Sequence, residues 1–328
     1  MYRFYNRIMH NPRPKLLLKI TRGNNIETLH NGWICVVDRN KKIVYKKGNI
    51  NDYIFLRSIA KPIQAIPLIK SDVKVSQKEL ASICGSHSGS ERHIHILKGL
   101  LKKYNLSLSD LQCGIHEPSD EKEKNKLLKV NLSPNALHNN CSGKHIGMLT
   151  VCKKNNWSLK NYINLNHPLQ KSILNKIKGL SEAKKIFLAT DGCSAPTFAL
   201  PIINIAKMFS NFTRDKQYSQ IINAMRLNPY LVGSKGQIDS EIIKASNRKL
   251  VSKVGAEGII IVAYNGNCAV VKIADGSQKA RSIVILRLLV KLGWLKESQI
   301  KNSALEKMVN LQVKNHAGKI VGEVQLNF

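Results

Sequence analysis

The sequence predicts an α/β fold whose mainly antiparallel sheet is assembled from both chain ends, with flanking helices and a helical lobe between them. Short runs rich in Val and Ile, broken by Gly, Asn and Asp, occupy residues 16–48. Similar runs return after residue 258, and most of the intervening chain has helical spacing. With 328 residues, 43% of them hydrophobic, the chain can bury a large core in one or two domains.

The N-terminal elements are predicted from apolar periodicity. Three strands of an antiparallel meander are expected at residues 16–23, 33–40 and 42–48. Apolar residues at helical spacing predict a helix over Ser58–Ile69, and a serine before a Lys-Glu-Leu turn starts a second over Ser76–Ile83. Further helices are expected within residues 94–130, 159–178 and 201–212.

The C-terminal part returns to strand character. Strands are expected at residues 185–190, 258–263 and 269–273. The last two are separated by Tyr-Asn-Gly-Asn, a strong signal for a hairpin turn. A long apolar helix is expected over Ala280–Leu292. Because no repeat or linker interrupts the pattern, we expect an N-terminal extension over 1–14 and one two-lobed domain over 15–328.

The chain is strongly basic, with 52 Lys and Arg against 21 Asp and Glu and a formal net charge of +31. Such charge raises the possibility of a nucleic-acid or membrane partner. The cations are spread along the whole sequence, however, and 40 of them are Lys against 12 Arg. Nucleic-acid readers depend on Arg forks and stacked aromatic rings. We therefore interpret most of the charge as compositional bias and expect no nucleic-acid partner.

The compartment is predicted from what the sequence lacks. No run approaches the ~18 apolar residues needed to cross a bilayer, so no membrane association is expected. Residues 1–15 contain arginines but no apolar stretch of signal-peptide length. The seven cysteines are an odd number without a Cys-x-x-Cys pair, which argues against a disulfide framework. A cytoplasmic location is expected.

The first cluster of residues that could take part in catalysis is Ser58-Ile-Ala-Lys61. Residues three apart share a helix face, so the Ser58 hydroxyl can lie beside the Lys61 amine, as an acyl-transfer site of the Ser-x-x-Lys type requires. The same spacing occurs six times in the chain, and chance on a solvated face explains any one of them. The first is set apart by Arg57, Pro62 and an apolar run, where burial can depress the lysine pKa.

Two further clusters contain small residues beside histidine or cysteine. Cys84-Gly-Ser86-His-Ser-Gly follows a predicted helix and can be a site or an ordinary Gly/Ser loop. The segment from His138 to His145 contains Gly143-Lys144 but lacks the first glycine and the Ser or Thr of a phosphate-binding loop. Its cysteine and histidines allow a metal site, although the spacing matches no standard zinc pattern.

Two more clusters adjoin predicted strands. Thr190-Asp191-Gly-Cys193-Ser-Ala-Pro follows a predicted strand and is expected to precede a helix, a common place for active sites in α/β proteins. Lys253-Val-Gly-Ala-Glu-Gly places a lysine and a glutamate in a glycine-rich bend before a buried strand. Each can also be an ordinary turn.

Taken in order, these clusters resemble the asparaginase II family, the rhizobial-type L-asparaginases. The resemblance rests on five polar motifs together with shorter stretches near both ends, and it extends from about Leu16 to the C-terminus. The motifs are RSIAKPIQA at Arg57, CGSHSG at Cys84, HNNCSGKHIGML at His138, DGCSAPTFALP at Asp191 and KVGAEG at Lys253. The resemblance implies a fold like that of serine β-lactamases and glutaminases, and a homodimer.

The resemblance also implies roles for particular residues. It implies two catalytic Ser-Lys pairs, Ser58 with Lys61 and Ser86 with Lys253. Zinc is implied as a structural or substrate-positioning ion, and substrate contacts are implied for three polar residues. The implied zinc ligands are Cys141, Lys144 and Cys193, and the implied substrate-binding residues are Arg57, His145 and Asp191.

The expected reaction is hydrolysis of L-asparagine to L-aspartate and ammonia through a Ser-Lys acyl-enzyme mechanism. Ser58 would attack the amide carbon with neutral Lys61 as base, while Ser86 and Lys253 relay protons to the leaving ammonia. A glutaminase or a β-lactam-type serine acyl hydrolase is the alternative within the same chemistry. A basic nucleic-acid-binding protein without activity is the alternative from another class.

Overall fold

The computed structural model describes residues 12–301 and 303–328. The expected N-terminal extension over residues 1–14 therefore lies mostly outside the described residues. The strands are β1 (Lys15–Arg22), β2 (Asn25–Val37), β3 (Ile43–Lys47), β4 (Tyr53–Phe55), β5 (Phe187–Thr190), β6 (Pro196–Pro201), β7 (Val251–Gly255), β8 (Ile259–Tyr264), β9 (Asn267–Ile273), β10 (Gln312–Lys314) and β11 (Ile320–Leu326).

The α-helices of the described residues are mostly short. They are α1 (Lys61–Gln64), α2 (Ile66–Lys70), α3 (Gln77–Cys84), α4 (Glu91–Lys103), α5 (Glu121–Lys129), α6 (Ser142–Lys154), α7 (Pro168–Ser181), α8 (Ile202–Arg214), α9 (Ser219–Leu227), α10 (Pro229–Val232), α11 (Ile238–Ala245), α12 (Gln278–Lys291) and α13 (Glu297–Lys301). The 3₁₀ helices are η1 (Arg57–Ala60), η2 (Leu108–Asp110), η3 (Ala136–His138), η4 (Lys216–Tyr218) and η5 (Glu306–Met308).

An eight-stranded sheet joins the two chain ends, as predicted. Its order is β10-β11-β1-β2-β9-β8-β7, with β3 paired to β2, and all its pairs are antiparallel. The predicted hairpin between β8 and β9 is confirmed, because Tyr264 pairs with Asn267 across a two-residue turn. Asn265 and Gly266 in that turn both have positive φ, the conformation in which Asn-Gly turns are favoured. Strands β4, β5 and β6 form a separate small sheet.

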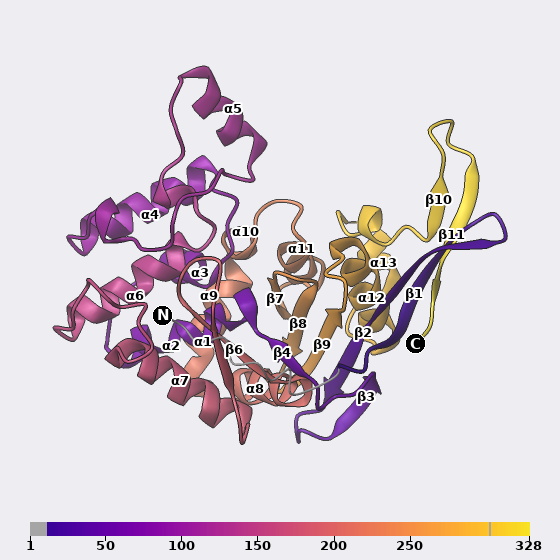
Figure 1. Cartoon of the computed structure of the whole chain (residues 1–328), viewed down its shortest axis with the longest axis horizontal. Helices are drawn as coiled ribbons and strands as arrows, with labels where there is room; N and C mark the ends of the chain where they lie inside the picture. The colour runs from indigo at the N-terminus through magenta and orange to yellow at the C-terminus, as the bar shows by residue number, and fades with distance from the viewer. Residues whose placement is uncertain (1–11, 302) are drawn as a thin grey trace.

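Both faces of the large sheet are covered, which explains why its central strands are apolar without alternation. In β2, Trp33, Cys35 and Val37 pack into the core of the helical lobe. Ile34 and Val36 point to the other face, into a second core with α12. Figure 1 shows α8 on the side of the sheet toward the helical lobe, and α11, α12 and α13 gathered beside the strands at the opposite end of the molecule.

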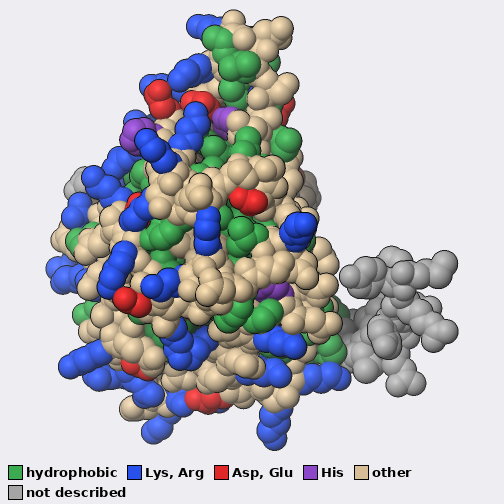
Figure 2. Space-filling view, turned by 90° about the vertical axis from the view of Figure 1, so that its left-hand side faces the viewer, with side chains coloured by type: hydrophobic (Ala, Val, Ile, Leu, Met, Phe, Trp, Pro, Cys, Tyr) green, Lys and Arg blue, Asp and Glu red, His purple; other side chains and the backbone are tan. Residues whose placement is uncertain are grey.

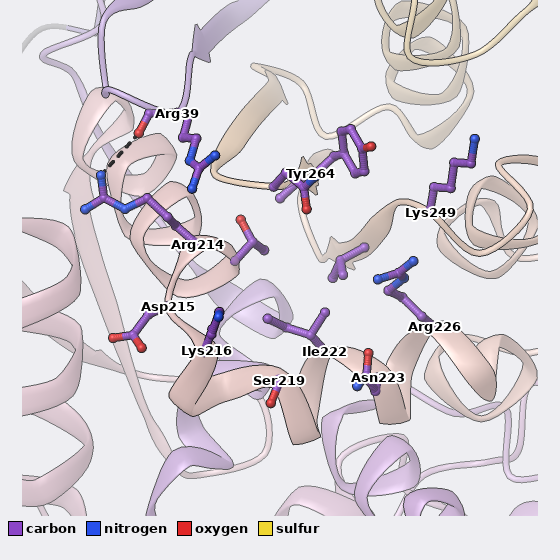
Figure 3. Close-up of a pocket in the computed structure, with 14 residues that line it drawn as sticks. Arg39, Arg214, Asp215, Lys216, Ser219, Ile222, Asn223, Arg226, Lys249 and Tyr264 are labelled. Atoms are coloured by element: carbon purple, nitrogen blue, oxygen red, sulfur yellow. Dashed lines mark hydrogen bonds between the residues drawn. The ribbon is translucent and has the colours of Figure 1, made fainter.

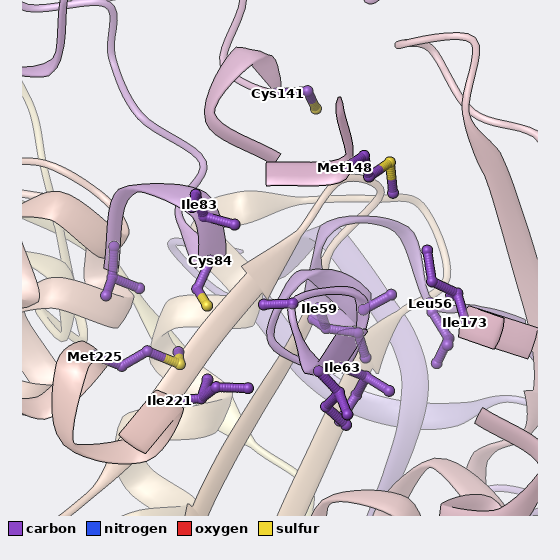
Figure 4. Packing of buried hydrophobic residues seen from close by; sticks show 14 of the residues in the cluster. Leu56, Ile59, Ile63, Ile83, Cys84, Cys141, Met148, Ile173, Ile221 and Met225 are labelled. Carbon is purple, nitrogen blue, oxygen red and sulfur yellow. The ribbon is translucent and has the colours of Figure 1, made fainter. Parts of the chain in front are cut away.

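The helical lobe holds the predicted Ser-Lys segment in its core. Figure 4 shows Ile59 and Ile63 near Cys84 and Ile221, residues that come from η1, α1, α3 and α9. Ile59, Ile63 and Cys84 are each 2% exposed or less. Burying one such side chain contributes about 1.5–3 kcal/mol. The backbone that carries Ser58 and Lys61 is therefore anchored by its apolar neighbours.

Several predicted elements were wrong in detail. The single helix expected over Ser58–Ile69 is divided into η1, α1 and α2, and each of the two α-helices has a proline in its first turn. Proline lacks an N–H and suits only the first turn of a helix, so Pro62 and Pro67 begin new segments. The helix expected from Leu159 begins at Pro168 for the same reason.

The polar segment after β5 also differs from expectation. Asp191 was expected between a strand and a helix, but the chain turns directly into β6. The Asp191 N–H donates to the Ala195 carbonyl, which closes this turn. The β5–β6 hairpin therefore places Asp191 and Cys193 together at one tip.

Lysines and arginines are spread over the face formed by the helical lobe instead of being gathered in one patch (Figure 2). This distribution agrees with the spacing of cations along the sequence. In the described part of the chain, no helix combines the length and apolar character that crossing a membrane requires.

Candidate active site

The amine of Lys61 lies at the centre of the site. Lys61 is 1% exposed, and its Nζ hydrogen-bonds to the Gly85 carbonyl at 2.7 Å, the Ser86 Oγ at 2.9 Å and the Asn140 carbonyl at 3.0 Å. The sequence motifs that begin at Arg57, Cys84 and His138 therefore meet at one nitrogen. Ser58 and Ser86 are both half-buried.

The partners of Lys61 suit a neutral amine as well as a charged one. A neutral amine has two N–H groups and one lone pair. The two carbonyl oxygens can only accept, so they take the two N–H groups, and the lone pair is left to accept a proton from a hydroxyl. The pKa of Lys61 lies below its ordinary value, chiefly because of burial, and repulsion from Lys144 and Lys253 acts in the same direction.

Lys253 is bound differently. Its Nζ donates to the Asp239 Oδ2 at 2.7 Å, and both side chains are fully buried. Burial acts against ionisation of Asp239, but Lys253 and the Val254 N–H stabilise the carboxylate and bring its pKa below the ordinary value. The pair is a buried ion pair in which removal of either partner strands the other.

Two glycines bring these segments into contact. A Cβ at Gly85 would lie 2.3 Å from the Leu231 carbonyl oxygen. Only glycine therefore lets the backbone before Ser86 pass this close to α10. A Cβ at Gly255 would lie 3.1 Å from the Leu56 carbonyl oxygen and 2.6 Å from Ile259. The end of β7 thereby packs against the turn that carries Arg57.

Arg57 and Asp191 form the polar edge of the site. The Arg57 Nε donates to the Asp191 Oδ1 at 2.8 Å, and Glu257 lies 3.9 Å from the same guanidinium. Arg57 has φ +48, a left-handed conformation that costs a non-glycine residue energy and is often found at functional sites. Its side chain is 28% exposed, so it can meet a ligand from solvent.

Cys141, Lys144 and Cys193 form a compact cluster beside Lys61. The Lys144 Nζ donates to the Cys193 Sγ at 2.9 Å, and Cys193 hydrogen-bonds to Cys141. That bond, with the charges of Lys61 and Lys144, brings the pKa of Cys141 well below its ordinary value despite burial. Burial opposes the charge of Lys144, but the two sulfurs outweigh it and raise the lysine pKa.

This donor set fits a soft divalent metal. Two sulfurs and one amine nitrogen converge, and thiolate and nitrogen ligands are those that Zn²⁺ prefers. The described residues contain no group of three or more His, Cys, Asp or Glu that could hold a metal. The present cluster is not such a group, since its third donor is a lysine. The Lys144 proton and the Cys193 proton must leave before both can act as ligands.

His145 lies one residue beyond Lys144 on α6 and is fully buried. Its Nδ1 is 2.6 Å from the Tyr162 hydroxyl, and its Nε2 has no hydrogen-bond partner in the described part of the chain. Burial, and the charges of Lys144 and Lys61, bring the His145 pKa well below its ordinary value. The ring is therefore neutral and retains one polar atom for a further contact.

The structure brings most of the expected site residues together but does not join the expected Ser-Lys pairs by hydrogen bonds. In the described residues, Lys61 contacts Ser86 instead of Ser58, and Lys253 contacts Asp239. The two expected pairings therefore stay predictions. Asp239 was not among the sequence candidates. Its signal was a carboxylate within the apolar pattern of α11, where a buried lysine such as Lys253 needs a counter-charge.

Comparison with known proteins decides the family. The family model for L-asparaginase II matches residues 18–326. The chain belongs to the L-asparaginase II family. The resemblance found in the five motifs is thereby confirmed, and the asparaginase II chain is an asparaginase-type amidohydrolase by family.

Two solved structures resemble this asparaginase II chain. A β-lactamase from Mycobacterium bovis has 13% identity and a TM-score of 0.42, covering 80% of this chain and 95% of that chain. A candidate β-lactamase from Bacteroides dorei has 10% identity and a TM-score of 0.43, covering 79% of this chain and 93% of that chain. The search of curated proteins returned no significant match.

Proposed function

We propose that the protein hydrolyses the side-chain amide of L-asparagine to L-aspartate and ammonia through an acyl-enzyme on Ser58. The observation that carries the proposal is the buried Lys61 amine, whose pKa is lowered by burial and which lies 2.9 Å from a second serine hydroxyl. A lowered pKa favours the neutral amine, which is the proton acceptor that acyl transfer by an unactivated hydroxyl requires.

In the proposed first step, the Ser58 oxygen attacks the amide carbon and its proton passes to Lys61. The Lys61–Ser86 hydrogen bond then provides the path by which this proton reaches the leaving nitrogen, so that the C–N bond breaks and ammonia departs. Water attacks the ester in the second step and releases aspartate, with Lys61 again taking the proton. Lys253, held by Asp239, keeps a positive charge near Lys61 that favours its neutral form.

The polar edge suits the α-substituents of an amino acid. Asp191 can bind the α-ammonium of the substrate, and Arg57 can bind its α-carboxylate. The two side chains already supply a negative and a positive charge to the 2.8 Å ion pair between them. The free Nε2 of His145 supplies a further polar contact inside the site.

The function is tested by measuring ammonia release from L-asparagine and L-glutamine with the intact chain. We expect turnover of asparagine, with glutamine slower by at least about tenfold, the discrimination that one extra methylene allows. Equal or faster hydrolysis of glutamine would make the protein a glutaminase. Covalent capture of a labelled penicillin on Ser58, without ammonia release, would instead support the β-lactam-type alternative.

The cluster of Cys141, Lys144 and Cys193 is proposed to bind zinc. The ion would position the substrate and stabilise the local structure. We expect about one zinc per chain by elemental analysis and loss of the metal in Cys193→Ala, with Cys268→Ala as the control for a buried thiol outside the cluster. Because zinc competes with the proton on Lys144, affinity should rise with pH. Zinc retained by Cys193→Ala, or affinity independent of pH, would contradict the assignment.

A further inference from the structure

A groove of about 390 Å³ lies apart from the proposed active site. Its walls are the C-terminal end of α8, helix α9, the turn between β8 and β9, and the turn after β2. Figure 3 shows Arg39 and Arg214 on one side and Arg226 and Lys249 on the other, with Ile222 between them. None of the proposed catalytic, substrate-binding or metal residues lines it.

The groove carries positive charge without compensation. Five cations line it against a single acid, Asp215, whose carboxylate already accepts the Gln217 N–H. The cations are Arg39, Arg214, Lys216, Arg226 and Lys249. None of the five takes part in a salt bridge within the described residues. Their combined potential therefore remains available to an anion from solution.

Two of the three arginines, Arg214 and Arg226, donate to backbone carbonyls. The Arg214 Nη1 donates to the Arg39 carbonyl at 3.4 Å, and the Arg226 Nε donates to the Arg248 carbonyl. A Cβ at Gly266 would lie 2.9 Å from the Arg39 Cγ and 3.3 Å from the Arg214 Cβ, so the β8–β9 turn is shaped to let both stems pass. Neutral partners orient these side chains and leave their positive charge unpaired.

Compositional bias explains this groove poorly. The bias favours lysine, with 40 Lys against 12 Arg, and it scatters them along the chain. Three of those twelve arginines nevertheless line one groove of fourteen residues. Arginine forks match the geometry of phosphate oxygens in a way that lysine does not.

We propose that this groove is a binding site for a nucleoside di- or triphosphate. The guanidinium groups of Arg39 and Arg226, approaching from opposite walls, would bind phosphate oxygens. Tyr264 stands at the rim with 37% of its surface exposed, and its ring offers a face on which a base can stack. The volume lies in the range of small-ligand sites, roughly 300–1,000 Å³.

The proposal is tested by calorimetry on the intact chain with ATP, inorganic tripolyphosphate, adenosine and a short single-stranded DNA. ATP should bind, tripolyphosphate should compete with it, and adenosine alone should bind much more weakly. The double variant Arg39→Gln/Arg226→Gln should weaken ATP binding at least about tenfold, as loss of charge-assisted hydrogen bonds predicts. An unchanged unfolding midpoint would show that the variant is folded.

The matched control is Lys122→Gln/Lys129→Gln, which removes the same charge from another basic surface, along α5. It should leave ATP affinity within about twofold, since general attraction alone is screened over a Debye length. Equal weakening by both double variants would show that overall charge is responsible and would overturn the site. So would absence of ATP binding, or DNA binding more tightly than ATP at the same salt concentration.

Discussion

Ser58→Ala is expected to reduce the rate of asparagine hydrolysis by at least about 10⁴-fold, because loss of a nucleophile removes the covalent route altogether. Ser86→Ala should cost less, about 10²-fold, since it interrupts a proton path while Ser58 and Lys61 remain. Ammonia release under saturating asparagine measures both, and mass spectrometry of quenched reactions locates the acyl group.

The control for this pair is Ser119→Ala, since Ser119 and Lys122 have the same spacing as Ser58 and Lys61 but lie exposed on the surface. It should leave the rate unchanged. If Ser58→Ala kept a near-normal rate, or if the acyl group were found on Ser86, the two serines would exchange roles. The Lys61–Ser86 hydrogen bond makes that second outcome the sharpest challenge to the proposed nucleophile.

Asp239→Asn is expected to destabilise the fold by about 3–5 kcal/mol, because it leaves the Lys253 ammonium buried without its counter-charge. Urea unfolding monitored by circular dichroism measures the change in the free energy of unfolding. Because the pKa of Asp239 is depressed in the fold, its stabilising contribution is present above the ordinary aspartate pKa and is lost as the pH falls through the folded value.

A second variant distinguishes the ion pair from simple packing damage. Asp239→Asn/Lys253→Met removes both charges and should recover part of the lost stability, whereas independent packing defects would add. Asp72→Asn is the matched control, since Asp72 pairs with Lys74 in full exposure, and it should leave the unfolding curve unchanged. A loss of stability in Asp239→Asn no larger than in this control would contradict the buried pair.

The sheet and its hairpins could be predicted because their signals are local. The Tyr-Asn-Gly-Asn turn and the apolar runs around it specify β8 and β9 without reference to the rest of the chain. Strand β7 was missed because Val251 to Gly255 contains a lysine, and nothing local shows that a partner carboxylate will bury it. The continuous helix expected over Ser58–Ile69 was wrong because Pro62 and Pro67 each begin a new helical segment.

The sequence predicted which segments contribute to the candidate site, but it could not predict the hydrogen bonds between them. The motifs predicted that Lys61, Ser86 and Cys193 belong to one site. In the structure Lys61 contacts Ser86, and Cys193 contacts Lys144. The acceptor that each lysine amine binds depends on how segments distant in sequence pack together in space. The Asn140 carbonyl that binds Lys61 has no sequence signature at all, because every residue has a carbonyl.

The assembly of one sheet from both chain ends has a consequence for how the protein folds during synthesis. Strand β2 pairs with β9, and β1 pairs with β11, so the first strands emerge from the ribosome long before their partners exist. Pairings this distant in sequence make folding slow and leave strand edges exposed meanwhile. Truncation after β8 should therefore yield an aggregation-prone chain, because β2 would lose the neighbour that covers its edge.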